Sequence, residues 1–181
     1  MKKILLFFAN GTEEIEALTV VDILRRAGAD VTVAGVGGKD LTGSHNIRIN
    51  ADIDAEELTS FDYDMVVIPG GLPGTTHLDE SAVVNQALET VSKNGGYLAA
   101  ICAAPLVLGK RGYLIGKNAT CYPGFESYLE GAKLPGARVC VDGNVITGAG
   151  MGAALDFSLA LTAVLFGEEK ATALRSAVIA D

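Results

Sequence analysis

Short apolar runs that stop at turns of small residues alternate with longer segments of helical periodicity along this chain. Residues 3–9 and 97–101 are apolar almost throughout, as expected of strands buried inside a sheet. A helical segment lies between most of these runs and is long enough to cross over the sheet. The alternation therefore predicts an α/β fold, in which a mostly parallel sheet carries helices on both faces.

The same pattern predicts the individual elements. In the first helix, Thr12 is the predicted N-cap and Gly28 the predicted C′ residue. Leu18 and Ile23 extend the apolar surface of this helix beyond its core stripe, which indicates a contact with a partner subunit, although a fully buried helix would show the same pattern. Strands are expected at 3–9, 31–35, 45–50, 63–68 and 97–101, a hairpin turn at Asp142-Gly143, and helices at 12–27, 81–93, 104–109, 152–166 and 168–180.

Composition narrows the class of protein. The 181 residues fit a single domain, 1–181, and 49% of them are hydrophobic, enough to build a core. A net charge of −8 without a basic stripe argues against nucleic acid and against an anionic membrane surface as partners. The apolar run at 4–9 is too short for a signal peptide, and no run approaches membrane-spanning length. Three cysteines, an odd number, then favour a reducing, cytoplasmic location.

Cys102 stands where a buried strand stops and a helix begins. Its neighbours are small, and Pro105 suits the first helical turn. A sharp turn of this kind presents a nucleophile at the top of a sheet, and a helix N-terminus lowers the pKa of a thiol placed there. The alternative is a small buried cysteine that packs as an alanine would.

Two further segments could complete a pocket around Cys102. Gly70 and Gly71 follow the strand at 63–68 and could turn backbone N–H groups toward a ligand, although an ordinary tight turn has the same composition. Glu16 lies beside the apolar stripe of the first helix, whereas Glu13 and Glu14 have a helix-dipole explanation. An inward carboxyl is costly and typical of functional sites, and a solvated helix face is the alternative for Glu16.

Neither histidine, His45 or His77, stands at ligand spacing from a cysteine or carboxylate, so the sequence predicts no metal site. The turn after the first strand is Asn10-Gly11-Thr12 and lacks a glycine-rich phosphate fingerprint. No cofactor is therefore expected.

Five segments together resemble the ThiJ/PfpI superfamily, and within it the bacterial-type members of the DJ-one branch (parkinsonism-associated protein deglycase). They span essentially the whole chain: residues 9–16, 22–28, 67–71, 99–105 and 150–157.

The resemblance implies a flavodoxin-like three-layer sandwich, of the class I glutamine amidotransferase-like type, and a homodimer formed through the first helix. It also implies that Cys102 is an oxidation-sensitive nucleophile with Glu16 as its carboxyl partner. Gly70, Gly71 and Ala103 would supply the backbone donors.

Two positions depart from the family pattern. Tyr122 stands where the human-like branch has a histidine, and a phenol with a pKa of about 10 is a poor base at neutral pH. It can still orient a substrate by donating a hydrogen bond. Ala103 stands where the protease-like branch has a histidine, which disfavours peptidase chemistry. His45 replaces an arginine of the related branch, and it either helps to bind anions at the pocket mouth or is an ordinary surface histidine.

The resemblance thus predicts a cysteine-dependent, cofactor-free deglycase or glyoxalase-type enzyme. Its substrates would be small dicarbonyls or glycated proteins. The alternative is a non-enzymatic redox sensor or stress chaperone that works through oxidation of Cys102.

Overall fold

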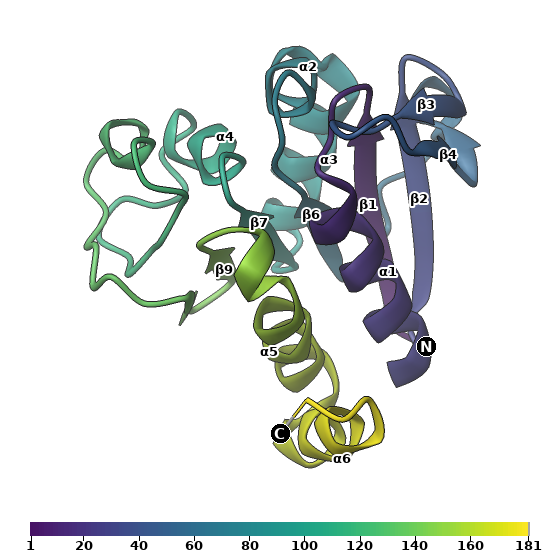
Figure 1. The fold of residues 1–181 in the computed structure, drawn as a ribbon. Helices are drawn as coiled ribbons and strands as arrows, with labels where there is room; N and C mark the ends of the chain where they lie inside the picture. Colours follow the sequence, from purple (N-terminus) through teal and green to yellow (C-terminus); the bar gives the residue numbers. More distant parts are fainter. Residues whose placement is uncertain (181) are drawn as a thin grey trace.

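A seven-stranded sheet with the order β5-β2-β1-β6-β7-β9-β8 forms the centre of the molecule in the computed structural model, which describes residues 1–180 (Figure 1). All neighbouring pairs are parallel except β8 and β9. The strands are β1 (Lys3–Ala9), β2 (Asp30–Val36), β5 (Ile53–Asp54), β6 (Met65–Ile68), β7 (Tyr97–Ile101), β8 (Val139–Asp142) and β9 (Val145–Gly148).

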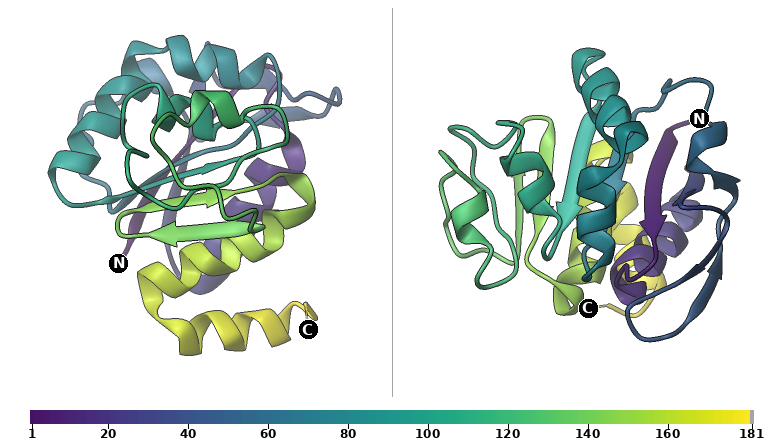
Figure 2. Two further views of the ribbon diagram at one scale, coloured as in Figure 1. Left: turned by 90° about the vertical axis from the view of Figure 1, so that its left-hand side faces the viewer. Right: turned by 90° about the horizontal axis from the view of Figure 1, so that it is seen from above.

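Helices cover both faces of this sheet, as Figure 2 shows. Side chains of α2, α3 and α4 pack on one face, and those of α1 and α5 pack on the other, with α6 outside α1 and α5. The helices are α1 (Glu14–Ala27), α2 (Gly74–Glu80), α3 (Ala82–Lys93), α4 (Pro105–Gly109), α5 (Ala154–Phe166) and α6 (Glu168–Ala177). The predicted flavodoxin-like α/β sandwich is confirmed.

The burial of β1, an inner strand of the sheet, explains why its sequence is apolar from Ile4 to Ala9. Successive side chains of a strand point to opposite faces of the sheet. Leu5 and Phe7 accordingly join the core under α3, whereas Leu6 and Phe8 join the core under α1 and α5. A strand buried on both faces needs apolar residues at every position, which is the pattern from which the parallel sheet is predicted.

Several boundaries differ from the predicted ones. Helix α1 begins at Glu14 with Glu13 as its N-cap, and Thr12 is not the cap: its hydroxyl accepts a hydrogen bond from the N–H of Ala9 (3.0 Å) within the turn. Gly28 is the left-handed C-terminal residue, as predicted, with φ 94°. The last helix ends at Ala177, and the β8–β9 hairpin turns at Gly143-Asn144, one residue later than expected.

The predicted strand at 45–50 is only partly correct. Three of its residues form β4 (Arg48–Asn50), which pairs antiparallel with β3 (Asp40–Thr42) in a separate two-stranded sheet. Polar and half-exposed residues dominate this hairpin, so the sequence carries little signal for it. Helix α2 was not predicted, because its glycine and two threonines are weak helix formers.

No helix among residues 1–180 is long and apolar enough to cross a membrane.

Candidate functional site

The carboxyl ends of β1, β6 and β7 lie side by side because the three strands are adjacent and parallel. Ligand sites of open α/β sheets are found at this edge. The turn after β1 is tied to the turn after β6 by a hydrogen bond from the Glu13 N–H to the Gly70 carbonyl (2.9 Å). The two turns and the end of β7 therefore form one continuous site.

Cys102 occupies the sharp turn between β7 and α4. Its φ of 65° lies in the left-handed region, where a non-glycine residue is strained by about 1–2 kcal/mol. Hydrogen bonds hold this conformation on both sides: the Cys102 N–H donates to the Gly148 carbonyl (2.9 Å), and the Cys102 carbonyl accepts from the Tyr122 N–H (2.8 Å). Pro105 begins the helix, as predicted. This geometry favours the elbow over an ordinary packed cysteine.

Glu16 points inward from the first turn of α1 and is fully buried. The Gly70 N–H donates to its Oε2 (2.8 Å), whereas Oε1 has no hydrogen-bond partner of regular geometry. A side chain at position 70 would collide with both functional groups, since a Cβ there would lie 2.7 Å from Cys102 Cβ and 2.7 Å from Glu16 Oε2. Gly70 therefore lets the carboxyl group approach the cysteine, and the solvated-face alternative for Glu16 does not apply.

Burial raises the pKa of Glu16 to about 7, opposed by its hydrogen bonds with Cys102 and Gly70. Burial also raises the pKa of the Cys102 thiol to about 12, with further contributions from the charge of Glu16 and the hydrogen bond to it. The position of Cys102 before a helix predicts a lowered thiol pKa, and this prediction is wrong. Helix α4 is short, and burial beside a carboxylate outweighs the effect of the amide donors. The two groups act as one pair, which loses its first proton near neutral pH.

Of the three predicted backbone donors, two reach the cysteine. The N–H groups of Gly71 and Ala103 hydrogen-bond to the Cys102 side chain and oppose the rise of its pKa. The Gly70 N–H is engaged by Glu16 instead. Gly71 needs to be glycine, because its φ is 88° and a Cβ would lie 2.3 Å from the Glu13 backbone nitrogen.

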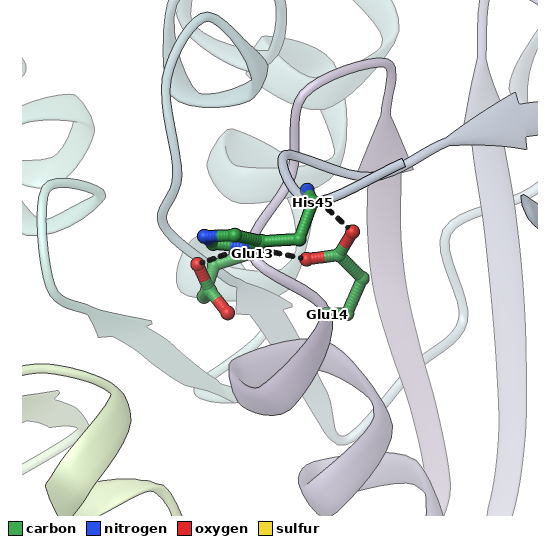
Figure 3. Close-up of side chains that lie close together, drawn as sticks. All are labelled: Glu13, Glu14 and His45. Carbon is green, nitrogen blue, oxygen red and sulfur yellow. Dashed lines mark hydrogen bonds and ion pairs between the residues drawn. The ribbon is translucent and has the colours of Figure 1, made fainter. Parts of the chain in front are cut away.

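The backbone of Tyr122 lies next to Cys102, whereas the side chain of His45 contacts two other glutamates. Tyr122 is half-exposed and bonded to Cys102 through its backbone; a Cβ at Gly150 would lie 3.1 Å from its ring. His45 follows the β3 strand and contacts Glu13 and Glu14 (Figure 3). Its side chain is exposed, and the Glu14 hydrogen bond and the Glu13 charge raise its pKa.

The cluster of Glu13, Glu14 and His45 was not predicted from the sequence. Both carboxylates are buried. Burial alone would raise the pKa of Glu14, but hydrogen bonds from the His45 and Ile47 N–H groups help to lower this pKa to about 2. About thirty residues separate His45 from the glutamates, so local spacing carries no sign of the cluster. The helix-dipole explanation accounts for acidic residues at this position but not for their burial.

Comparison with known proteins agrees with this architecture. The model of the DJ-1/PfpI family matches residues 2–164. Protein dj-1beta of Drosophila melanogaster is 41% identical over 172 residues, covering 93% of this chain and 92% of its own. A Caenorhabditis elegans relative, DJR-1.2, is named a glutathione-independent glyoxalase and is 35% identical over 90% of this chain and 87% of its own.

Solved structures give the same assignment. The structure of oxidized Toxoplasma gondii DJ-1 superimposes with a TM-score of 0.94 at 34% identity, covering 99% of this chain and 98% of that one. Drosophila melanogaster DJ-1beta superimposes with a TM-score of 0.92 at 38% identity, over 98% and 97% of the two chains. The family model, the relatives and the fold agree, and the chain belongs to the DJ-1/PfpI family.

Proposed function

We propose that this protein is a cysteine-dependent, cofactor-free enzyme of the deglycase or glyoxalase type, acting on reactive dicarbonyls or on early glycation adducts. The observation that carries the proposal is the strained Cys102 turn, which sets a thiol against the buried Glu16 carboxyl and two backbone donors. Strain of this kind is typical of functional sites. The glyoxalase name of the C. elegans relative supports the same class of reaction.

In the proposed reaction, the Cys102 sulfur bonds to the aldehyde carbon of the dicarbonyl while the thiol proton passes to the carbonyl oxygen. The Gly71 and Ala103 N–H groups, which already face the sulfur, stabilise that oxygen. Glu16 then removes the proton from the attacked carbon and returns one to the adjacent ketone carbon, while the proton of the new hydroxyl group passes to the ketone oxygen, so that the attacked carbon becomes a thioester carbonyl and the ketone becomes an alcohol. The aldehyde carbon is oxidised as the ketone is reduced, so no external redox reagent is consumed.

Water completes the cycle by cleaving the resulting thioester, which releases a 2-hydroxy acid and restores the thiol. A hemithioacetal adduct enters the same sequence when its carrier thiol leaves and Cys102 takes its place. A carboxyl group with a pKa of about 7 suits both proton transfers, since a catalytic acid or base works best near the operating pH. Tyr122 is proposed to orient the substrate rather than to act as a base.

Turnover of methylglyoxal and of a glycated peptide by the wild type, Cys102→Ser and Cys140→Ser tests this proposal. We expect Cys102→Ser to lose both activities and Cys140→Ser, a change at another buried free thiol, to retain them. Equal rates in the wild type and Cys102→Ser, or no turnover in either, would contradict an enzymatic role.

The alternative is a redox sensor or stress chaperone in which Cys102 is oxidised, with Glu16 and the same amides stabilising the oxidised sulfur. The Toxoplasma relative solved in an oxidized form supports this candidate. Peroxide titration followed by mass spectrometry of the three thiols tests it. We expect oxidation first at Cys102, and earlier oxidation of Cys121 or Cys140 would remove the basis of the sensor role.

We also propose a cytoplasmic homodimer that assembles through α1. Ile15 and Leu18 are large apolar side chains of this helix that remain 54% and 40% exposed in the single chain. Ile23, which also extends the apolar surface of the helix, is instead buried within the chain against α5 and α6. The unpaired surface is therefore confined to the first half of α1.

A further inference from the structure

Four polar side chains converge at the start of α1 without involving Cys102. Glu13 is the N-cap of α1 and Glu14 is its first residue, and His45 comes from the turn between β3 and β4 (Figure 3). Ser44 comes from the same turn as His45. The glutamate side chains are only 6% and 4% exposed, whereas the His45 side chain is 68% exposed. The cluster is thus a buried pair of carboxylates beneath a histidine that faces solvent.

The four facing atoms are almost equally spaced. Ser44 Oγ lies 3.1 Å from Glu13 Oε2, 3.1 Å from Glu14 Oε2 and 3.0 Å from His45 Nδ1. His45 Nδ1 lies 3.3 Å from Glu13 Oε2 and 3.1 Å from Glu14 Oε2. Five of the six separations among these atoms therefore fall between 3.0 and 3.3 Å.

Hydrogen bonding accounts for only part of this convergence. With both carboxylates ionised, the four atoms carry at most two protons, one on the Ser44 hydroxyl and one on His45 Nδ1. Two protons can form good hydrogen bonds in two of the five contacts. In the other three contacts, lone pairs face one another. Glu14 Oε1 has separate donors, the N–H groups of His45 (2.8 Å) and Ile47 (3.4 Å), but Glu13 receives no backbone donor among the described residues.

The charge of the cluster is also uncompensated. Among residues 1–180, no lysine or arginine pairs with Glu13 or Glu14, and His45 is their one cationic partner. A protonated His45 would still leave a net negative charge on two buried carboxylates. Burying charge without a counter-charge is costly, and a bound cation offsets that cost.

The geometry points to a binding site for a divalent transition-metal ion, Zn²⁺, formed by Glu13 Oε2, Glu14 Oε2, His45 Nδ1 and the Ser44 oxygen or a water in its place. Tetrahedral zinc holds nitrogen and oxygen ligands at about 2.0–2.1 Å, which requires ligand atoms roughly 3.3 Å apart. The observed separations need only a small outward movement. An imidazole nitrogen in the set favours zinc over Mg²⁺ or Ca²⁺, which prefer oxygen ligands alone.

The surrounding backbone is built to keep the ligands in place. The His45 and Ile47 N–H groups hold the second oxygen of Glu14, which leaves Oε2 directed at the cluster. Gly43 makes room for the carboxylate, because a Cβ at that position would lie 2.2 Å from Glu14 Oε1. The exposed face of His45 gives the ion a path from solvent.

Zinc binding to the purified full-length protein, measured by competition with a chromophoric chelator under reducing conditions, tests the proposal. We expect one equivalent of Zn²⁺ in the wild type and in Cys102→Ser. In Glu13→Gln and His45→Ala the affinity should fall by more than about tenfold, since loss of even an outer-shell partner costs 10–100-fold. His77→Ala is the matched control, because His77 bonds to the Asn10 carbonyl outside the cluster, and it should bind as the wild type does.

A second measurement separates this site from the thiols. Co²⁺ substituted at a site of nitrogen and oxygen ligands gives visible d–d bands without the intense thiolate charge-transfer band. Unchanged affinity in His45→Ala, whose exposed side chain can be removed without unfolding the chain, would overturn the proposal. Loss of binding in Cys102→Ser, or no binding to the wild type, would overturn it equally. None of these outcomes depends on enzymatic turnover.

Discussion

At the residue scale, the Cys102–Glu16 pair controls the reactivity of the site. Once the pair has lost one proton, the remaining proton resides on either group. The fraction of these singly protonated pairs that have a thiolate and a protonated carboxyl does not change with pH. Alkylation of Cys102 should therefore rise with a midpoint near 7, the pKa of Glu16, although the pKa of the Cys102 thiol itself is raised to about 12 by burial and by Glu16.

Iodoacetamide alkylation of Cys102, followed by mass spectrometry across pH, measures this midpoint. In Glu16→Gln no carboxylate can accept the proton of the Cys102 thiol. The midpoint of alkylation should therefore move to higher pH, because burial still disfavours the thiolate. A wild-type midpoint near that of an unperturbed thiol, about 8.5, would undercut both the enzymatic and the redox proposals.

Glu16 should also make the stability of the fold depend on pH. Its pKa rises from 4.5 to about 7 on folding, so between these values the folded chain keeps a proton that the unfolded chain has lost. The free energy of unfolding should then fall as pH rises through this window, by about 3 kcal/mol at about 1.4 kcal/mol per tenfold change in proton affinity.

Urea unfolding of the wild type and Glu16→Gln at several pH values measures this dependence. Since the glutamine cannot ionise, the variant should gain stability relative to the wild type as pH rises from 4.5 to 7 and hold that gain above it. Glu130→Gln, at an exposed carboxylate, is the control that should run parallel to the wild type. Parallel curves for Glu16→Gln would contradict the raised pKa.

At the element scale, the end of α1 depends on one backbone conformation. Gly28 has a φ of 94°, and its missing Cβ would meet no atom within 4 Å, so any cost of a side chain there is conformational alone. We expect Gly28→Ala to lower the free energy of unfolding by about 1 kcal/mol. Gly152→Ala is the matched control, because its Cβ also finds open space and its φ is not left-handed. Equal stability of both variants in urea would contradict this explanation.

Elements with a strong apolar period were predictable, and elements without one were not. The strands β1 and β7 and the helices α1, α3 and α5 carry apolar residues that the sheet demands, so the sequence alone locates them to within a few residues. The β3–β4 hairpin and α2 lack such a period and depend on tertiary contacts. Thr12 shows the same limit at a boundary, since a hydroxyl suited to capping a helix bonds instead to the strand before it.

At the scale of the whole molecule, strand order decides how much of the site the sequence could reveal. Cys102, Gly71 and Ala103 follow strand ends, so a parallel sheet brings them together and their grouping was predictable. The engagement of Gly70 by Glu16 and the contacts of His45 with Glu13 and Glu14 depend on side-chain directions and on a loop that crosses the helix start. Those contacts could not be read from spacing.

The proposed dimer is a prediction at the same scale. Sedimentation velocity should give a dimer for the wild type and a monomer for Leu18→Arg, because a charge would be buried at the centre of the α1 contact. Ile115→Arg, at an apolar side chain that is 68% exposed beyond α4, should leave the dimer intact. A wild-type monomer, or a dimer that survives Leu18→Arg, would contradict assembly through α1.

The left-handed turn at Cys102 has an evolutionary consequence. Glycine suits the backbone at that φ and is favoured there by about 1 kcal/mol over a residue that has a Cβ, such as alanine. Selection for stability alone would therefore replace the cysteine with glycine. The thiol persists only while a cell benefits from it. A descendant of this chain that is no longer under selection for the thiol should therefore drift toward glycine at position 102. Its fold would become more stable, and it would lose the reactive sulfur.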